Sequence, residues 1–585
     1  MRLILTYFKP LWKQLLLIVG FTAISVWATL KIPAVMSQII DQGILSNDLG
    51  LIVRQGLWML ALSLADISGM IASDIITSRA MARLAGDLRL DIFRRIESFS
   101  LNEIDKFSTA SLITRSTNDV QQVQQSFQMV LGLAIQAPIM IVGAVIGALR
   151  TAPSMTWLIV LTVAILLVGM AVIFGIVTPK YKVLQDLVDR LNLVARENLA
   201  GLRVIRAFNN ESIEERKFNQ ANTDKAKLET WVNRITGILQ PGMSLVVNLA
   251  VLAIIWVGAH LIVESKLEIG NMMAFLQYAM MVVFNVLMLA MVISTLPRAR
   301  VSAGRIATIL ETKCQIVEPA NPETIDDDRR GELEFRHVTF SYPGAESAVL
   351  NDVSFTARPG GMTAIIGSTA SGKSTLVNLI PRLYDVTSGQ ILIGGHDIRR
   401  ISRAELVKAL GFVPQRGVLF SGTVASNIKY ADEDISDKEM RRAAKIAQAD
   451  FIEELDSKYK ARIAQGGNNV SGGQKQRLSI ARAIAKDPDI LVFDDSFSAL
   501  DYQTDAKLRR QLLGQESDKT ILVVTQRIST IKDASQIIVL DKGKVVGVGT
   551  HRRLLNSCSV YREIASSQFS DSEMKRELEE AKYVG

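Results

Sequence analysis

Long uninterrupted runs of apolar residues fill the first half of the chain, and the second half has none of comparable length. Six of these runs are long enough to cross the hydrocarbon core of a membrane, which takes about 20 helical residues. They cover residues 14–34, 56–77, 127–149, 156–178, 238–262 and 272–296. The pattern predicts a membrane domain of six helices over residues 1–305, a linker over 306–330 and a soluble domain over 331–585.

The connections between the predicted spans alternate in length and charge. Residues 79–126 and 180–234 form two long connections rich in lysine and arginine, whereas the others are short and carry few of either. Because basic loops stay on the cytoplasmic side of a membrane, we expect both long loops, the N-terminus and the second half of the chain in the cytoplasm. The expected protein is an integral, multi-pass protein of the cytoplasmic membrane.

Both long loops show the periodicity of helices. Met81, Leu84 and Leu88 recur at helical spacing in the first, as do Leu184 and Leu191 in the second. Neither loop shows the alternation of a strand. The pattern therefore predicts helical arms that carry the membrane helices on into the cytoplasm.

The periodicity changes from about residue 331. Residues 333–335 and 338–340 alternate between apolar and polar, and residues 490–493 and 521–524 are short runs of strand-forming residues. Helical stretches such as 374–380 lie between the strands. This interleaving predicts an α/β domain after the membrane domain.

Composition narrows the classes of protein further. With 49% hydrophobic and 21% charged residues among 585, the chain is neither disordered nor an ordinary soluble globule. Two cysteines, Cys314 and Cys558, are too few for a disulfide scaffold or a multi-cysteine metal site. The apolar content predicts a lipid bilayer as the surroundings of the chain. The net charge of +8 is modest for this length, so we expect no nucleic acid as a partner.

Residues 367–374 read G-S-T-A-S-G-K-S and match the phosphate-binding P-loop, between a short apolar strand and a helix that starts near Ser374. Glycines in such a loop let backbone N–H groups approach phosphate oxygens, Lys373 would meet the β- and γ-phosphates, and Ser374 would bind Mg²⁺. ATP and Mg²⁺ are therefore the expected ligands. The candidate nucleotide-binding residues here are Gly367, Ser368, Thr369, Ala370, Ser371, Gly372, Lys373, Ser374 and Thr375.

Two further signals follow the P-loop. Residues 490–494 form an apolar strand that ends in Asp494, from where a carboxylate can hold Mg²⁺. Ahead of this strand, Ser471 and Gln474 form the S-x-x-Q pattern of a capping box, which predicts a helix start. Gly472 and Gly473 would leave the positive end of that helix open to close approach by a phosphate.

Six spans followed by one domain with these motifs resemble a half-transporter of the ABC exporters, of the multidrug type with the type IV fold. The resemblance covers nearly the whole chain. It implies that two chains pair head to tail, with each ATP between the P-loop of one chain and the signature turn of the other. The signature residues that would contact the partner's ATP are Ser471, Gly472, Gly473 and Gln474.

The resemblance also implies roles outside these motifs. Tyr342 would stack on adenine, and Gln415 would join Ser374 and Asp494 around Mg²⁺. Short coupling helices near residues 103–110 and 209–215 would end the cytoplasmic arms and push against the ATPase domains. The D-loop would consist of Ser498, Ala499, Leu500 and Asp501.

The chain departs from the family pattern at Asp495, where the family has the glutamate that polarises the attacking water, and at Gln526, where it has the switch histidine. Aspartate is shorter by about 1.3 Å, and misplacement near 1 Å can cost about 100-fold in rate. Glutamine cannot carry positive charge toward a phosphate. A softer departure is Gln465, which replaces a glutamate common just ahead of the signature.

Because both catalytic departures lie on the P-loop side while the signature is intact, we expect the degenerate-site subunit of a heterodimer. Such a chain hydrolyses ATP competently only as part of a dimer, and its own P-loop site is impaired. Two alternatives stay open: Asp495 still works slowly, or the chain forms a homodimer with two slow sites.

Polar residues inside the predicted spans are candidates for the transport pathway because burying them in lipid is costly. Asp66 would pair with a cationic substrate if it faces the interior of the bundle, and otherwise would bond a neighbouring helix or reach toward the membrane surface. The last span places Gln277, Tyr278 and Asn285 among several methionines, which would suit an adaptable apolar surface, although any one of these methionines could instead face lipid.

The function expected from these features is ATP-driven export of small hydrophobic or cationic compounds by alternating access. A lipid or peptide exporter of the same architecture is an alternative that the sequence does not separate from it. A nucleotide-gated regulator or channel is a third, because binding without turnover would suit Asp495 and Gln526.

Overall fold

The computed structural model describes residues 6–582, so the first five and last three residues of the expected domains lie outside the described residues. The chain divides into two compact units. The helical unit comprises the chain up to residue 97 together with residues 109–312, and the α/β unit comprises residues 98–108 together with the chain from 313 onward.

The apolar runs of the first half become long helices, as predicted. Six helical segments of the described residues are long and apolar enough to cross a membrane. The helices of this unit are α2 (Trp12–Gln38), α3 (Leu49–Glu97), α5 (Thr109–Thr114), α6 (Val120–Thr151), α7 (Thr156–Ala207), α8 (Glu211–Gly237), α9 (Leu239–Val263) and α10 (Ile269–Glu311). Helix α10 therefore includes the first residues of the expected linker.

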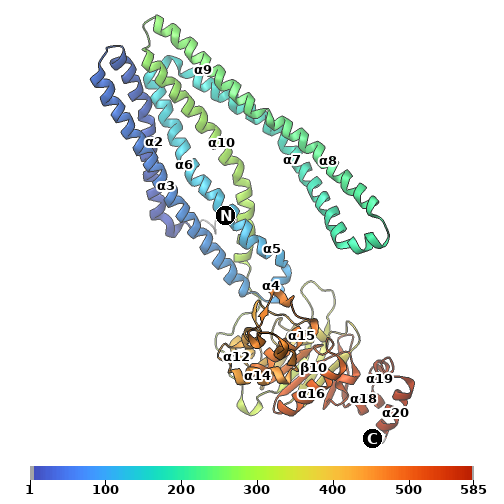
Figure 1. Cartoon of the computed structure of the whole chain (residues 1–585). Coiled ribbons are helices and arrows are strands. Elements are labelled where there is room, and N and C mark those ends of the chain that lie inside the picture. Colours follow the sequence, from blue (N-terminus) through green and yellow to red (C-terminus); the bar gives the residue numbers. More distant parts are fainter. Residues whose placement is uncertain (1–5, 583–585) are drawn as a thin grey trace. The chain divides into compact units, whose positions relative to one another are not determined.

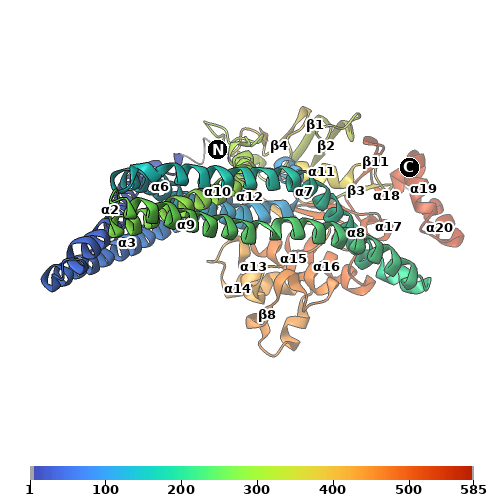
Figure 2. The ribbon, with the colours of Figure 1, turned by 90° about the horizontal axis from the view of Figure 1, so that it is seen from above.

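Within the helical unit, α2, α3, α6 and α10 pack into a bundle, while α7 pairs with α8 and α9 (Figures 1 and 2). In Figure 1 the α7–α8 pair diverges from the bundle toward the turn that joins them. Large apolar side chains such as Val160, Leu252 and Trp256 are exposed on the outer faces. This distribution suits a lipid environment, where apolar surface carries no penalty.

The predicted helical arms are confirmed, because the membrane helices continue without a break. Helix α3 has 49 residues and α7 has 52, which correspond to about 74 and 78 Å at 1.5 Å per residue. Both are much longer than the hydrocarbon core, which is about 30 Å thick. No residue of either long connection lies in a strand.

The two expected coupling helices have different outcomes. Near residues 103–110 the structure has α4 (Leu101–Lys106), which begins and ends slightly earlier than expected. The expectation of a short helix at 209–215 is wrong, because α8 starts at Glu211 and runs on to Gly237. Asn209 adopts a left-handed conformation (φ 53°), which reverses the chain in three residues and leaves no room for a separate helix.

The α/β unit contains two main sheets, as the interleaved pattern predicted. The larger has the order β12-β11-β3-β10-β9-β6, parallel except for β12, and the smaller has the order β2-β1-β4-β5 and is antiparallel. The strands are β1 (Leu333–Phe340), β2 (Leu350–Ala357), β3 (Gly361–Gly367), β4 (Ser388–Ile393), β5 (His396–Asp397), β6 (Leu410–Val413), β9 (Ile490–Asp494), β10 (Thr520–Val524), β11 (Gln536–Asp541) and β12 (Lys544–Gly549), besides a small pair, β7 (Gly422–Thr423) and β8 (Arg462–Ile463).

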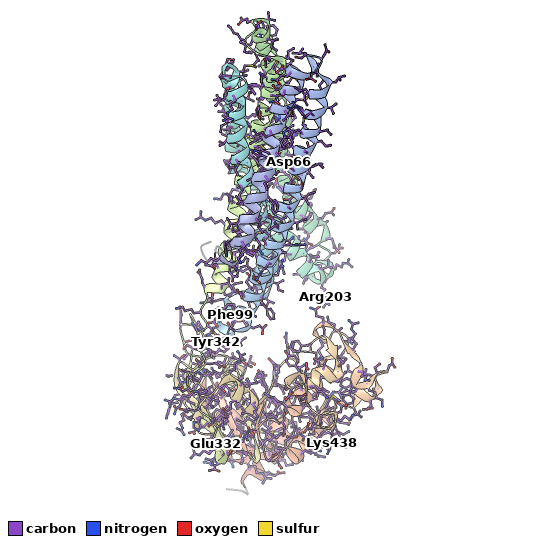
Figure 3. All side chains as sticks on the ribbon, turned by 90° about the vertical axis from the view of Figure 1, so that its left-hand side faces the viewer. Asp66, Phe99, Arg203, Glu332, Tyr342 and Lys438 are labelled. Atoms are coloured by element: carbon purple, nitrogen blue, oxygen red, sulfur yellow. The ribbon has the colours of Figure 1, made fainter. Side chains whose placement is uncertain are left out.

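Helices cover the sheets of this unit. They are α11 (Lys373–Leu379), α12 (Arg403–Ala409), α13 (Val424–Ile428), α14 (Asp437–Ile446), α15 (Gly472–Ala485), α16 (Tyr502–Gln515), α17 (Ile528–Ile531), α18 (His551–Ser557), α19 (Ser559–Ser566) and α20 (Asp571–Lys582). Figure 3 shows Glu332, next to β1, and Lys438, on α14, on opposite sides of the unit.

The central strands of the larger sheet are buried on both faces. Ile365 and Leu522 pack with the smaller sheet, whereas Ala364 and Val523 pack with the helices on the other face. This explains why these strands read as continuous apolar runs instead of alternating ones. Because β3, β9 and β10 are parallel, their carboxyl ends lie at the same edge of the sheet.

Helix α4 belongs to the α/β unit although it lies between α3 and α5 in the sequence. Ser100 caps α4 in a capping box with Glu103, whose buried carboxylate also accepts the Gln315 N–H at 3.3 Å. Leu101 packs against the core beside the smaller sheet. These contacts fix α4 on the unit that carries the P-loop.

Gly389 in β4 offers a test of the smaller sheet. A Cβ at Gly389 would lie 2.2 Å from the carbonyl oxygen of His337, whereas one at Gly344 would meet nothing within 4 Å. Both glycines have φ near 80°, so Gly344→Ala isolates the backbone cost, about 1–2 kcal/mol. We expect Gly389→Ala to destabilise the α/β unit by a further 1–3 kcal/mol or so.

The measurement is limited proteolysis of the full chain during heating, because all six tryptophans precede residue 257 and do not report on the α/β unit. Equal shifts in the unfolding temperature for the two variants would contradict the predicted clash.

Candidate nucleotide-binding site

The P-loop connects β3 to α11, as the sequence predicted. Gly367 must be glycine because a Cβ there would lie 2.1 Å from the carbonyl oxygen of Leu540. Ala370 (φ 62°) and Gly372 (φ 99°) adopt left-handed conformations that close the loop around the start of α11. The backbone N–H groups of this turn and the positive end of α11 suit an anionic ligand.

Lys373 lies inside this loop. Its ammonium group donates to the carbonyl oxygens of Gly367 and Ser368, both at 2.7 Å, and to Ser371 Oγ at 3.3 Å. Burial lowers the pKa of Lys373, although the carboxylates of Asp495 and Asp494 partly offset this effect. A phosphate oxygen would be a stronger acceptor for this ammonium group than the neutral carbonyls.

Ser374 and Asp494 meet at the carboxyl edge of the sheet. Ser374 Oγ donates to Asp494 Oδ1 at 3.4 Å, and Asp494 is buried. Burial raises the pKa of Asp494, the hydrogen bond from Ser374 lowers it in part, and the nearby Asp495 carboxylate raises it further. Two hard oxygen donors at one point fit Mg²⁺, which takes its remaining ligands from water and phosphates.

Gln415 follows β6, which pairs with β9 in the same sheet. Gln415 is exposed. Two residues before it, at the end of β6, the carbonyl oxygen of Val413 accepts a hydrogen bond from Ser496 Oγ at 3.0 Å. This bond holds the end of β6 next to the turn that follows Asp494. The amide oxygen of Gln415 is the type of neutral ligand that Mg²⁺ also accepts. The described residues include no group of three or more His, Cys, Asp or Glu side chains able to hold a metal on their own.

Asp495 follows Asp494 in a strained conformation (φ 44°). Its N–H donates to the carbonyl oxygen of Val524 at 2.8 Å, and its own carbonyl accepts Ser498 Oγ at 2.7 Å. These bonds hold the Asp495 backbone between the end of β10 and the D-loop. The position of its short side chain is therefore set by backbone that cannot easily move closer to a ligand.

Gln526 lies in the loop between β10 and α17. The loop begins at Thr525, whose N–H donates at 3.1 Å to the carbonyl oxygen of Ile365 on β3, the strand that leads into the P-loop. Gln526 is exposed, and Arg527 reaches the carbonyl oxygen of Ser498 at 3.1 Å. The structure thus joins the loop of Gln526, the D-loop and the turn of Asp495 into one network.

The predicted capping box at the start of α15 is confirmed. Ser471 accepts the N–H of Gln474 at 3.3 Å, and Gln474 Oε1 accepts the N–H of Ser471 at 2.9 Å. A Cβ at Gly473 would lie 3.3 Å from the carbonyl oxygen of Ala499, a tight contact, so the signature turn passes close to the D-loop. Asp501, the last D-loop residue, caps α16 by accepting the Thr504 N–H at 2.9 Å; Leu500 is buried. Gln465 is exposed in the turn ahead of this region.

Tyr342 lies beyond the end of β1, and Figure 3 shows it just below Phe99, which precedes α4. Its hydroxyl group is 3.1 Å from Thr375 Oγ1 on α11, and its ring meets that of Tyr384 edge-on, with centroids 5.4 Å apart. Tyr384 in turn donates to Asp105 Oδ2 on α4 at 3.0 Å. Burial, followed by this hydrogen bond, raises the pKa of Tyr384 above its ordinary value, so the hydroxyl remains a donor.

Sequence reasoning missed Tyr384 and Asp105. Only the position of Tyr384 shortly after the P-loop helix offered a signal, and an aromatic residue there is equally typical of a core. The structure shows a continuous chain of contacts from Asp105 on α4 through Tyr384 and Tyr342 to Thr375 on α11.

The candidates for a transport pathway lie on α3 and α10. Asp66, labelled on the helical unit in Figure 3, is half-buried and accepts a hydrogen bond from Ser25 of α2, so it bonds a neighbouring helix, one of the two alternatives to ligand contact. Tyr278 is buried, and its hydroxyl donates to the carbonyl oxygen of Leu30 at 3.0 Å. Gln277 is half-buried, and Asn285 donates to the carbonyl oxygen of Met281 at 2.8 Å. Tyr278 thus packs between helices of its own chain in this structure.

Two family models match the chain. The ABC transporter transmembrane region matches residues 15–287, and the ABC transporter model matches residues 350–498. The first therefore covers the membrane helices, and the second covers the P-loop, the signature and the start of the D-loop.

The chain is also similar to known proteins over nearly its full length. It is 42% identical to an uncharacterized ABC transporter ATP-binding protein of Mycobacterium tuberculosis, over 97% of this chain and 98% of that protein. An ATP-dependent lipid A-core flippase of Syntrophus aciditrophicus is 32% identical over 85% of this chain and 82% of its own. Among solved structures, a bacterial Atm1-family ABC exporter with ATP bound matches with a TM-score of 0.79 and 25% identity, covering 96% of this chain and 99% of the other.

The hydrogen bond between Tyr384 and Asp105 can be tested in the free protein. Tyr384→Phe removes a bond to a carboxylate, so we expect amide hydrogen exchange of residues 98–108 to become about tenfold faster. The matched control is Tyr502→Phe, which alters an exposed tyrosine on α16. Unchanged exchange at α4 in Tyr384→Phe would show that this bond does not hold the helix.

Proposed function

The chain belongs to the ABC transporters, as an exporter-type half-transporter with one transmembrane region and one ATPase domain, and we propose that it is the hydrolytically impaired subunit of a heterodimer. Transport by proteins of this type is driven by ATP. The proposed cargo is a small hydrophobic or cationic compound. The N-terminus and the ATPase domain would lie in the cytoplasm, as the basic connections between spans require.

The observation that carries the proposal is the turn at Asp495. A general base must come within about 3.2 Å of the proton that it takes. The Asp495 backbone is held by Val524 on one side and Ser498 on the other, so a shift that compensates for the missing methylene would strain or break these bonds. Water activation at this site would therefore be slow, while nucleotide binding would not depend on it.

Gln526 also supports slow hydrolysis at this chain's own P-loop site. Its amide can donate one hydrogen bond to a phosphate oxygen but carries no charge, so it stabilises the charge that develops on a leaving phosphate less than an imidazolium would. Both departures act on the ATP held by this chain's own P-loop.

The residues that would hold Mg-ATP are complete. Lys373 would neutralise phosphate oxygens, and Tyr342, beside α11, would cover the adenine. Ser374, Asp494 and Gln415 would hold Mg²⁺, whose chemistry is to bridge and neutralise the phosphates. The residues that would bind ATP are present, but the Asp495 carboxylate would lie too far from the attacking water. This P-loop is therefore suited to retain ATP more than to hydrolyse it.

The signature turn of this chain remains suited to a working site. The capping box and the open glycines of α15 present a positive helix end that a partner's ATP could approach. We propose that this turn completes a competent site on a second half-transporter that carries the glutamate and the histidine. The apolar residues exposed near the tip of α7, such as Leu199, Val204 and Phe208, support burial against another subunit.

Movement would pass from nucleotide to membrane through α4. The contact chain from Thr375 through Tyr342 and Tyr384 to Asp105 joins the P-loop helix to α4 within one unit. Closure of the ATPase domains around ATP would thus shift α4 and, through the chain itself, α3. This supports alternating access, in which the spans open to one side of the membrane at a time.

Lipid export is a second candidate for the cargo. One relative is an ATP-dependent lipid A-core flippase, and that protein matches most of this chain. Asp66 within the bundle favours a cationic compound instead, provided that its bond to Ser25 opens in another state. Transport assays with cationic dyes and with labelled lipids would distinguish the two.

We expect the purified chain alone to hydrolyse ATP slowly, and the pair with its partner to hydrolyse it faster. Asp495→Glu should raise turnover at this chain's site, by up to about 100-fold, because it returns the carboxylate to reach. Affinity for ATP should stay within about twofold. Measurements are steady-state ATPase rate and equilibrium ATP binding in nanodiscs, with the exposed Asp533→Glu as matched control.

Brisk hydrolysis by the chain alone would overturn the heterodimer proposal. A large loss of ATP affinity in Asp495→Glu would count against the role given to Asp495. Passive conductance opened by a non-hydrolysable nucleotide would favour a channel over a pump.

A further inference from the structure

The segment between α19 and α20 sends one side chain to the loop that carries Gln526. Gln568 Nε2 donates to the carbonyl oxygen of Gln526 at 2.7 Å, and Gln568 Oε1 accepts the N–H of Ile528 at 2.9 Å. A single primary amide therefore binds the backbone on both sides of Arg527.

The two backbone groups need an external partner. Ile528 is the first residue of α17, so its N–H has no acceptor within the helix. Glutamine offers a donor and an acceptor on one planar group, which matches the carbonyl and the N–H together. Glutamate offers only acceptors at neutral pH, and methionine, of similar length, offers no donor and only a weakly accepting sulfur.

Gln568 is itself held by the C-terminal helices. Its own N–H and that of Phe569 donate to the carbonyl oxygen of Ala565 at 3.0 and 2.9 Å. The Phe569 ring packs on the core and meets the buried His551 ring edge-on, with centroids 6.4 Å apart. The backbone from which Gln568 extends is thus fixed to α18 and α19.

Other bonds hold the residues on either side of Gln526. Thr525 is bound to β3 through Ile365, its Oγ1 accepts the Arg527 N–H at 3.1 Å, and the Arg527 side chain reaches the D-loop. The carbonyl of Gln526 itself is held by Gln568. The Gln526 side chain is exposed, so the position of its backbone sets the region that its amide can reach.

We propose that Gln568 is a positioning residue that keeps Gln526 within reach of the γ-phosphate, and so sets how strongly this P-loop prefers ATP to ADP. The inference rests on the proposed function, in which ATP occupies this P-loop and Gln526 takes the place of the switch histidine. A neutral amide interacts with a phosphate only at hydrogen-bond distance, because it lacks the longer reach of a charge. A small shift of the loop would therefore remove the contact.

The test compares MgATP and MgADP binding to the full chain in nanodiscs. Gln568→Met should lower ATP affinity about fivefold to tenfold, the effect of one lost hydrogen bond, and leave ADP affinity within about twofold. Gln568→Glu should do the same, because its carboxylate faces the carbonyl oxygen of Gln526 without a donor. The matched control, Gln515→Met, makes the same substitution at an exposed position of α16 and should change neither affinity.

A double-mutant cycle shows whether Gln568 acts through Gln526. Gln526→Ala alone should reproduce the loss of ATP affinity, and combining it with Gln568→Met should add no further loss. Additive losses, equal losses of ATP and ADP affinity, or an unchanged ATP-to-ADP ratio in Gln568→Met would each overturn the inference.

Failure of the proposed function would look different. A wild-type chain that bound neither nucleotide, with affinities equal to those of Lys373→Ala, would overturn the proposed function and this inference together. Normal ATP binding by the wild type with no change in Gln568→Met overturns the inference alone.

Discussion

The parallel pairing of β3, β9 and β10 is the constraint on which the nucleotide site depends. Because these strands run in the same direction, their carboxyl ends lie at one edge of the sheet. The P-loop, the Asp494–Asp495 turn and the loop of Gln526 each begin at that edge. A register shift in any of the three strands would separate Ser374 from Asp494 and dismantle the arrangement.

This edge also explains how a site can bind without turning over. In the proposed function, binding would rely on backbone N–H groups and on Lys373, which the P-loop itself fixes in place. Catalysis would rely on the reach of one carboxylate from a turn that is bonded at both ends. Binding tolerates small changes of side-chain length, whereas catalysis does not. The loss of one methylene would therefore slow hydrolysis and leave ATP binding intact.

Features that depend on local pattern could be predicted from the sequence, and those that depend on distant partners could not. The six spans, the P-loop and the capping box of Ser471 follow from spacing within a few residues. The partners in the bonds Tyr384–Asp105, Gln568–Gln526 and Ser25–Asp66 are 279, 42 and 41 residues apart, so no periodicity reveals them. The short helix expected at 209–215 was wrong because one left-handed asparagine made a tighter turn than the family pattern implied.

Helix α3 is unbroken over 49 residues and contains no proline, whereas α7 has Pro179 within it. Because α3 is about 74 Å long, a tilt of the whole helix by about 5° displaces its far end by about 6 Å. Its last residue, Glu97, is separated from α4 by only three residues. Under the proposed coupling through α4, a slight turn of α3 at its Glu97 end would therefore displace its other end by several ångströms, because α3 contains no proline kink.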